Sequence, residues 1–141
     1  MNITYKVFND LPNEAKFIRT IVFVDEQHFV DEFESNENKA IHIVMFDEDK
    51  PIATSRIIYQ DKHKCYVIGR FAVIKEYRKL GIGKELMKIT EQEIISRFGH
   101  IQIGISSQIQ AQGFYEKCGY KATSETYLDQ HCPHIWMVKY L

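Results

Sequence analysis

The residues best suited to chemistry lie in a short segment with the sequence RKLGIG, Arg78–Gly83. This segment follows a run typical of a β-strand, Arg70–Val73, and precedes a helical pattern of apolar residues. Glycines at a helix start let backbone N–H groups approach an anion closely, and the helix dipole favours negative charge there. Between Lys75 and Lys88, five basic residues outnumber two acidic ones. The segment therefore predicts a local site for a polyanion such as a pyrophosphate.

Two common phosphate-binding motifs are excluded by the same residues. A Walker loop needs glycine at position 78 and serine or threonine at position 85, where this chain has Arg78 and Glu85. A dinucleotide fingerprint built on Gly81 and Gly83 needs a third glycine at position 86, which is Leu86. The pattern R-x-x-G-x-G remains. Taken alone, it is equally compatible with an ordinary helix start that carries surface lysines.

The elements that must position this segment alternate between strands and helices. Hydrophobic periodicity predicts strands over residues 3–8, 41–46, 52–59, 65–73, 100–105, 120–127 and 135–141. It predicts helices over residues 14–24, 83–98 and 110–117. The acidic segment between residues 25 and 40 has neither pattern and is interpreted as a solvated loop. This order predicts a mixed α/β sheet in one domain, residues 1–141.

Composition excludes several classes of protein. The chain has 141 residues, 45% hydrophobic and 26% charged, which is typical of one soluble domain with its own core. Its formal net charge of -1 provides no overall field for nucleic acid or an acidic membrane, and no window has the apolar length of a membrane span. Three cysteines at scattered spacing favour a reducing compartment over a disulfide framework. We therefore expect a cytoplasmic protein with no nucleic-acid or membrane partner.

Several motifs in order resemble one family. The R-x-x-G-x-G segment is followed by an amphipathic helix, a strand and a short helix with the sequence GFYEKCGY, Gly113–Tyr120. Together with VFVDEQ (Val22–Gln27), IGRFAV (Ile68–Val73) and PHIWM (Pro133–Met137), this arrangement resembles the GNAT superfamily of acyl-CoA N-acyltransferases and is similar to its ElaA-like branch. The resemblance covers essentially the whole chain. It implies the GNAT fold, acetyl-CoA as co-substrate, and a small-molecule or peptide amine as acceptor. A homodimer is common among similar proteins, and the oligomeric state stays open.

The resemblance also implies which residues bind the cofactor. The pyrophosphate of acetyl-CoA is expected on the turn at the helix start. Backbone N–H groups of the preceding strand are expected to polarise the thioester carbonyl. Gln108 is expected to bond pantetheine amides, although capping of the next helix is an alternative role. The implied residues are Phe71, Ala72, Val73, Arg78, Lys79, Leu80, Gly81, Ile82, Gly83, Lys84, Gln108 and Phe114.

Acetyl transfer to an amine needs a base for the acceptor and, to a smaller extent, an acid for the leaving thiol. An alkylammonium has a pKa near ~10.4 and a thiol near ~8.5, so removal of the amine proton is the harder step. Tyr115 occupies the position where GNAT enzymes commonly carry a tyrosine acid, with ring packing as the alternative role. Glu26 is the first candidate for the base, although a carboxylate that only bonds to backbone fits equally. His134 and His42 are further candidates.

Two rival interpretations depend on other residues. The cluster HCPH, His131–His134, contains soft metal ligands, but its spacing matches no common zinc site, so no metal is expected. A catalytically silent module that senses acyl-CoA is the alternative function. The chain is predicted to be an acetyl-CoA-dependent N-acetyltransferase that moves the acetyl group directly to a primary amine. The identity of the acceptor stays open.

Overall fold

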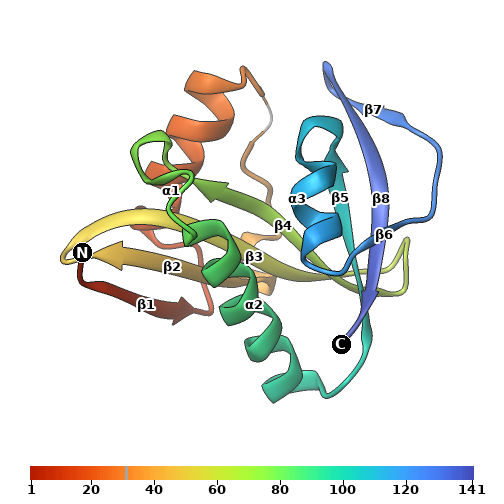
Figure 1. The fold of residues 1–141 in the computed structure, drawn as a ribbon, viewed down its shortest axis with the longest axis horizontal. Helices are drawn as coiled ribbons and strands as arrows, with labels where there is room; N and C mark the ends of the chain where they lie inside the picture. The colour runs from red at the N-terminus through yellow and green to blue at the C-terminus, as the bar shows by residue number, and fades with distance from the viewer. Residues whose placement is uncertain (31) are drawn as a thin grey trace.

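The computed structural model describes residues 1–30 and 32–141, which form one mixed sheet with helices packed on it (Figure 1). The order across the sheet is β1-β2-β3-β4-β5-β8-β6, and β7 pairs with β8. The pairing of β4 with β5 is parallel and the others are antiparallel. The strands are β1 (Ile3–Phe8), β2 (Ile41–Asp47), β3 (Lys50–Gln60), β4 (Cys65–Val73), β5 (Gln102–Gln108), β6 (Lys121–Ala122), β7 (Tyr127–Asp129) and β8 (Cys132–Tyr140).

Three α-helices connect the strands: α1 (Asn13–Arg19), α2 (Ile82–Phe98) and α3 (Gln112–Lys117). The helix expected over residues 14–24 is present, but its second half, Thr20–Glu26, is a π-helix. Short 3₁₀ turns cover Glu37–Lys39, Lys75–Tyr77 and Ile109–Ala111. Within the described residues, none of the helices combines the length and the apolar character needed to cross a membrane. The predicted α/β class and single domain agree with this arrangement.

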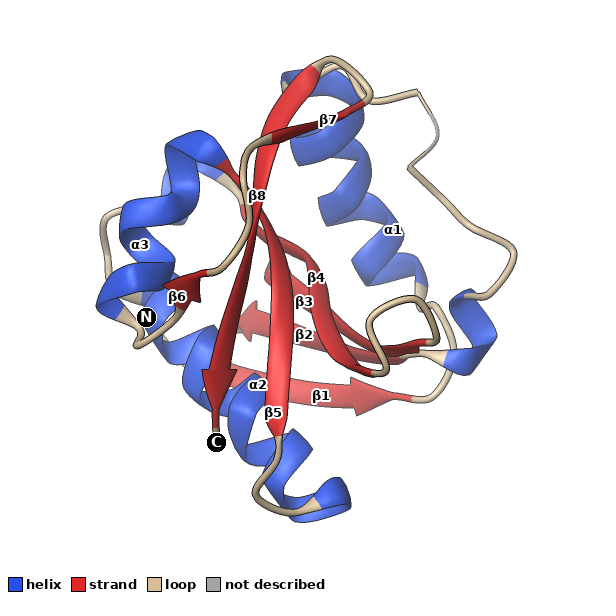
Figure 2. Cartoon of the chain, turned by 90° about the vertical axis from the view of Figure 1, so that its right-hand side faces the viewer, coloured by secondary structure: helices blue, strands red, loops and turns tan. Residues whose placement is uncertain are grey.

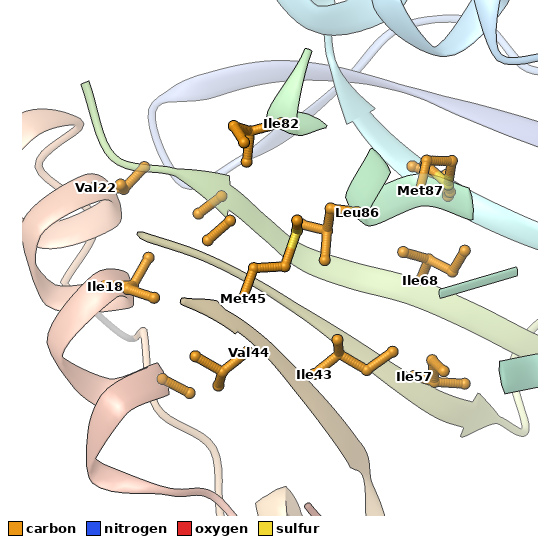
Figure 3. Close-up of a cluster of buried hydrophobic side chains, with 14 of the residues drawn as sticks. Ile18, Val22, Ile43, Val44, Met45, Ile57, Ile68, Ile82, Leu86 and Met87 are labelled. Atoms are coloured by element: carbon orange, nitrogen blue, oxygen red, sulfur yellow. The ribbon is translucent and has the colours of Figure 1, made fainter. Parts of the chain in front are cut away.

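The core lies between the sheet and the two longer helices. Side chains alternate across a strand, so neighbouring residues of β2 point to opposite faces. Figure 3 shows Met45 reaching toward Leu86 of α2, whereas Val44 lies beside α1, near Ile18. All four side chains are fully buried. The two helices therefore cover opposite faces of the central strands, as Figures 1 and 2 both show.

Strands β4 and β5 separate soon after they meet. Their parallel pairing joins only Val67 with Gly104 and Ile68 with Ile105. Among the described strands, nothing pairs with the later half of β4 on that side. Figure 2 looks toward β5 and β8, with α3 and α1 to either side of them. The separation leaves an unpaired backbone edge in the middle of the molecule.

A β-bulge lies in the same part of β4. The register with β3 shifts so that Ala72 pairs with Thr54 but Gly69 pairs with Arg56, leaving two β4 residues opposite one β3 residue. One of these two, Arg70, has a left-handed φ of 46°. Bulges redirect side chains and occur often beside active sites. This bulge turns the side chain of Arg70 to the cavity described below.

Two expectations from the sequence are wrong. The strand expected over residues 120–127 is reduced to the two residues of β6 and the start of β7, because only these positions pair with β8. The acidic segment is not simply a solvated loop. Glu32 and Glu37 are 5% and 6% exposed, and both form ion pairs with the buried guanidinium of Arg19. The loop is thus fixed to α1 by charge.

Candidate active site

A cavity of about 880 Å³ lies where β4 and β5 separate. Residues of β3 and β4, including Arg56 and Arg70, line one wall. Residues of β5, α3, β7 and β8 line the other, among them Tyr115 and His134. Two predicted catalytic residues, far apart in the sequence, therefore reach one space. Glu26, the third, is not among the residues that line it.

Three hydrogen bonds connect the segment after the π-helix to the C-terminal half of the chain across this cavity. The Nε2 of Gln108 donates to Oε1 of Gln27 at 2.7 Å. The backbone N–H of Val30 donates to Oε1 of Gln130 at 3.0 Å. The Nε2 of His131 lies 2.7 Å from the carbonyl oxygen of Gln27, which can only accept. These bonds hold the segment after the π-helix against β5 and the turn between β7 and β8.

The glycine turn provides unpaired donors at the start of α2. The backbone N–H groups of Ile82, Gly83 and Lys84 find no acceptor among the described residues, and the first helical bond runs from Glu85 to Gly81 at 3.1 Å. Gly81 has a φ of +80°, which requires glycine for conformational reasons. Free N–H groups at the start of a 17-residue helix suit a phosphate group. This observation supports the predicted pyrophosphate site.

Glycine at position 83 leaves room for an aromatic ring. A Cβ atom at this position would lie 3.3 Å from Cζ of Phe114 and 3.9 Å from a methyl of Val73. The glycine thus lets the Phe114 ring lie against the first turn of α2. The Phe114 ring in turn contacts Tyr115, with ring centroids 5.3 Å apart. The expected role of Phe114 beside the cofactor is compatible with this position between turn and cavity.

Arg78 and Glu26 form an ion pair that the sequence did not indicate. The two Nη atoms of Arg78 lie 2.7 and 2.8 Å from the carboxylate oxygens of Glu26, and its Nε donates to the carbonyl oxygen of Val73 at 2.9 Å. The hydrogen bond from Arg78 lowers the pKa of Glu26. A carboxylate held ionised by a bidentate arginine is a weak proton acceptor. The structure therefore brings together the predicted base and a predicted phosphate ligand, outside the cavity.

The last residues of β4, Phe71–Val73, present the unpaired edge of that strand. Phe71 also lines the cavity, and its ring centroid is 5.9 Å from that of Tyr115. Backbone N–H groups at an open strand edge can bond an extended ligand or a carbonyl oxygen. This geometry is compatible with the implied role of these residues toward the thioester. The remaining turn residues, Lys79 and Leu80, are exposed, and Lys79 has a left-handed φ of 63°.

Tyr115 is held by other aromatic rings. Its side chain is 7% exposed and makes edge contacts with Phe71, Phe114 and Tyr120. Burial, with a smaller contribution from Cys118, raises the pKa of Tyr115 above its ordinary value. The hydroxyl is therefore protonated throughout the neutral range and is able to donate.

His134 is fixed in one tautomer by its surroundings. Its Nδ1 lies 2.9 Å from the carbonyl oxygen of Cys132. A carbonyl only accepts, so in the neutral ring Nδ1 carries the proton and Nε2 carries the lone pair. Within the described residues Nε2 has no hydrogen-bond partner, and the residue lines the cavity at 5% exposure. The ring of Tyr127 stacks 6.2 Å away and supports the orientation of His134. This arrangement can accept a proton.

The other candidates lie elsewhere. His42 is buried in β2, its Nε2 bonds the carbonyl oxygen of Glu37 at 2.8 Å, and burial lowers its pKa. Gln108 lines the cavity but its amide is shared with Gln27 and Gln110. Within the described residues, the HCPH segment and its surroundings hold no group of three or more side chains suited to a metal ion.

Two arginines that line the cavity were not among the residues predicted from the sequence. Arg56 lies in β3 at 4% exposure, and Arg70 lies at the bulge of β4. A signal was available, because each places a charge inside a segment that hydrophobic periodicity predicts as a strand, in ATSRIIY and IGRFAV. A charged residue inside a buried strand needs a partner or a function.

Comparisons with known proteins identify the family of the chain. The family model described as "Acetyltransferase (GNAT) domain" matches residues 12–141. The uncharacterized protein YyaT of Bacillus subtilis (strain 168) is 35% identical over 138 residues, covering 90% of this chain and 87% of YyaT. The uncharacterized N-acetyltransferase YjcF of the same organism is 34% identical over 129 residues, covering 89% of this chain and 90% of YjcF.

Solved structures show the same fold. Escherichia coli ElaA superposes with a TM-score of 0.88 at 24% identity, covering 97% of this chain and 99% of ElaA. An aminoglycoside 6'-N-acetyltransferase complexed with coenzyme A superposes with a TM-score of 0.73 at 19% identity, covering 99% of this chain and 97% of that enzyme. The resemblance expected from the motifs is confirmed, and the chain belongs to the GNAT acetyltransferase family.

Proposed function

We propose that this acetyltransferase moves an acetyl group from acetyl-CoA directly to the nitrogen of a primary amine. The observation that carries the proposal is the pairing of Tyr115 and His134 in one cavity. One holds its proton because burial raises its pKa, and the other, with its Nδ1 bonded to a backbone carbonyl, turns Nε2 to the cavity. Acid and base in separate environments are the arrangement that amine acylation requires. The names of relatives such as YjcF add support for transfer to nitrogen.

The residues present fit acetyl-CoA. The unpaired N–H groups at the start of α2 accommodate a pyrophosphate, and the open edge of β4 accommodates an extended chain that leads toward Tyr115. Acetyl-CoA, when bound, supplies a thioester whose carbonyl carbon is the electrophile. Backbone N–H groups of Phe71–Val73 would bond the carbonyl oxygen as negative charge develops on it.

The protein's own groups account for the protons of the reaction. The amine nitrogen forms a bond to the acetyl carbon as the carbon–sulfur bond breaks. Nε2 of His134 takes the proton that the nitrogen loses, and the Tyr115 hydroxyl gives one to the departing thiolate. Exchange with solvent then restores both side chains. No acyl-enzyme is needed, and Cys132, the nearest thiol in sequence to His134, takes no part. The three cysteines carry free thiols, which supports a reducing compartment such as the cytoplasm.

His134→Asn tests the proposal. Asparagine can keep a donor near the carbonyl oxygen of Cys132, but it removes the Nε2 lone pair. We expect thiol release from acetyl-CoA to depend on an added amine, and kcat to fall by about 10²-fold or more in the variant with little change in the KM for acetyl-CoA. The exposed His100→Asn is the matched control. If no primary amine in a broad panel accelerates thiol release, the protein is instead a silent acyl-CoA-binding module.

A further inference from the structure

Three arginines meet the acidic segment, and they differ in how fully their donors are used. Every nitrogen of the Arg19 guanidinium is bonded: Nε to Glu32 at 2.6 Å, Nη1 to Glu37 at 3.2 Å, and Nη2 to Glu37 at 2.7 Å. Its side chain is 1% exposed and does not line the cavity. Arg19 is thus committed to holding the loop. It shows how a purely structural arginine of this cluster is bonded, for comparison with the other two.

Arg56 and Arg70 are incompletely bonded. Arg56 uses Nη1 alone, toward Glu34 at 2.8 Å and Glu37 at 3.3 Å, and its buried Nε has no partner within the described residues. Arg70 uses Nε and Nη2, both toward the carbonyl oxygen of Glu32, at 3.2 and 3.1 Å. Within the described part of the chain, Nη2 of Arg56 and Nη1 of Arg70 have no acceptor.

These free donors belong to side chains that line the cavity. Nη2 of Arg56 lies 3.7 Å from the point where a Cβ of Gly69 would be, and Gly69 is itself part of the cavity wall. Arg70 follows Gly69 directly, in the bulge. Its side chain is 22% exposed, against 5% for Arg56. Because Gly69 has no side chain, nothing from this position lies against Nη2 of the buried Arg56 guanidinium.

The acids near Arg70 are shared with the other two arginines. Glu32 is shared between Arg70, at 3.0 Å, and Arg19, at 2.6 Å. Glu34 lies 2.8 Å from Arg56 and 3.6 Å from Arg70. Burial, followed by repulsion from Arg56, lowers the pKa of Arg70 in spite of these carboxylates. An additional anion at the free donors would be stabilised by two charged groups at once.

We propose that Arg56 and Arg70 bind a carboxylate of the acceptor, so that the acceptor is an amino acid or a similarly small amine that carries its own carboxylate. The inference rests on the proposed function, because it identifies the acceptor of that reaction. The arginines lie on the β3–β4 wall and His134 lies on the opposite wall. One acceptor molecule that spans the cavity presents its carboxylate to the arginines and its amine to Nε2 of His134.

Equilibrium binding tests the inference without requiring turnover. Trp136 is the sole tryptophan of the chain, lines the cavity, and stacks on His63 with ring centroids 3.8 Å apart. Its fluorescence therefore reports occupancy of the cavity. The probes are matched sets: leucine, leucinamide and 3-methylbutylamine, and lysine with 1,5-diaminopentane. We expect the free amino acids to bind at least about tenfold more tightly than the partners that lack the carboxylate.

Two variants locate the effect. Arg70→Gln removes the outer guanidinium, and Gly69→Ala places a methyl in van der Waals contact with Nη2 of Arg56. Each is expected to close most of the affinity gap while leaving the affinity for the amines and amides unchanged. Arg97→Gln, on the exposed face of α2, is the control and should keep the gap. If Arg70→Gln does not fold, Gly69→Ala alone decides.

Several outcomes would overturn the inference. Equal affinities within the matched sets, no binding of any amino acid, or a gap that survives both variants each removes the carboxylate subsite. If 1,5-diaminopentane binds more tightly than lysine, this wall instead binds a cationic group, through Glu34. The same proteins are then assayed for acetyl transfer. An affinity gap without transfer contradicts the proposed function alone, and transfer to amines without a gap contradicts the inference alone.

Discussion

At the scale of single residues, the two side chains proposed as acid and base differ in their surroundings. Tyr115 lies among three aromatic rings, and its environment favours the neutral phenol. His134 is polarised by a backbone carbonyl on one side and opens to the cavity on the other. Glu26, a carboxylate with the right chemistry for a base, is neutralised by Arg78. The proposed roles therefore rest on the environment of each side chain more than on its residue type.

Tyr115→Phe tests the acid role. The substitution removes the hydroxyl and keeps the ring contacts, so the KM for acetyl-CoA should hardly change. We expect kcat to fall by roughly 10²-fold, the lower end for general acids, because a thiolate leaves reasonably well without help. Since the pKa of Tyr115 is raised, the wild-type enzyme should keep this contribution across the neutral and mildly alkaline range. The control is the exposed Tyr140→Phe. A wild-type kcat would leave Tyr115 as packing.

At the scale of elements, the π-helix and the glycine turn are connected through one ion pair. Glu26 is the last residue of the π-helix, and Arg78 lies just before the turn. Arg78 also bonds the last carbonyl of β4, at Val73. A single side chain thus connects three elements around the expected position of the cofactor. The pair is about one-third exposed, so its strength is that of a surface salt bridge, roughly 0.2–1 kcal/mol.

Glu26→Gln separates a connecting role from a catalytic one. If Glu26 only positions Arg78, the loss of about 0.2–1 kcal/mol changes the KM for acetyl-CoA by about fivefold at most. The kcat and the shape of its pH profile should stay close to wild type. A catalytic base would instead lose about 10²–10⁴-fold in kcat, mainly at low pH. Steady-state kinetics across pH decide, with Glu93→Gln on the exposed Arg97 pair as the control.

At the scale of the whole molecule, local features were predictable and distant pairings were not. The glycine turn, the helix behind it and Tyr115 follow from motifs of a few residues. Arg78 and Glu26 are 52 positions apart, and no spacing rule connects them. The split between β4 and β5, which makes the cavity, lies beside a bulge at which Arg70 adopts a left-handed φ of 46°. Sequence patterns do not predict such strained conformations.

The same limit explains the acidic segment. Its carboxylates resemble a solvated run until the fold brings Arg19, Arg56 and Arg70 beside them from three different elements. The cluster joins α1, β3 and β4 to the loop that borders the cavity. Removing one partner from such a cluster leaves a buried charge without compensation, which is costly. The stability of the whole fold should therefore depend on these ion pairs.

The pH dependence of unfolding tests this at Glu37. Burial alone would raise the pKa of Glu37, but Arg19, with Arg56 next, outweighs burial and lowers it from 4.5 to about 2. A lowered pKa in the folded state stabilises the fold above the unfolded pKa, and this stability is lost as pH falls from about 4.5 through about 2. The difference corresponds to about 3 kcal/mol.

In urea titrations, Glu37→Gln should be less stable than wild type by about this amount at pH 7 and nearly equal to it near pH 2. Glu32 is present in both proteins, so its titration largely cancels, and the exposed Glu125→Gln should follow wild type throughout. If the free energies of unfolding of wild type and Glu37→Gln differ by the same amount at every pH, Glu37 stabilises the fold through packing and not through its charge.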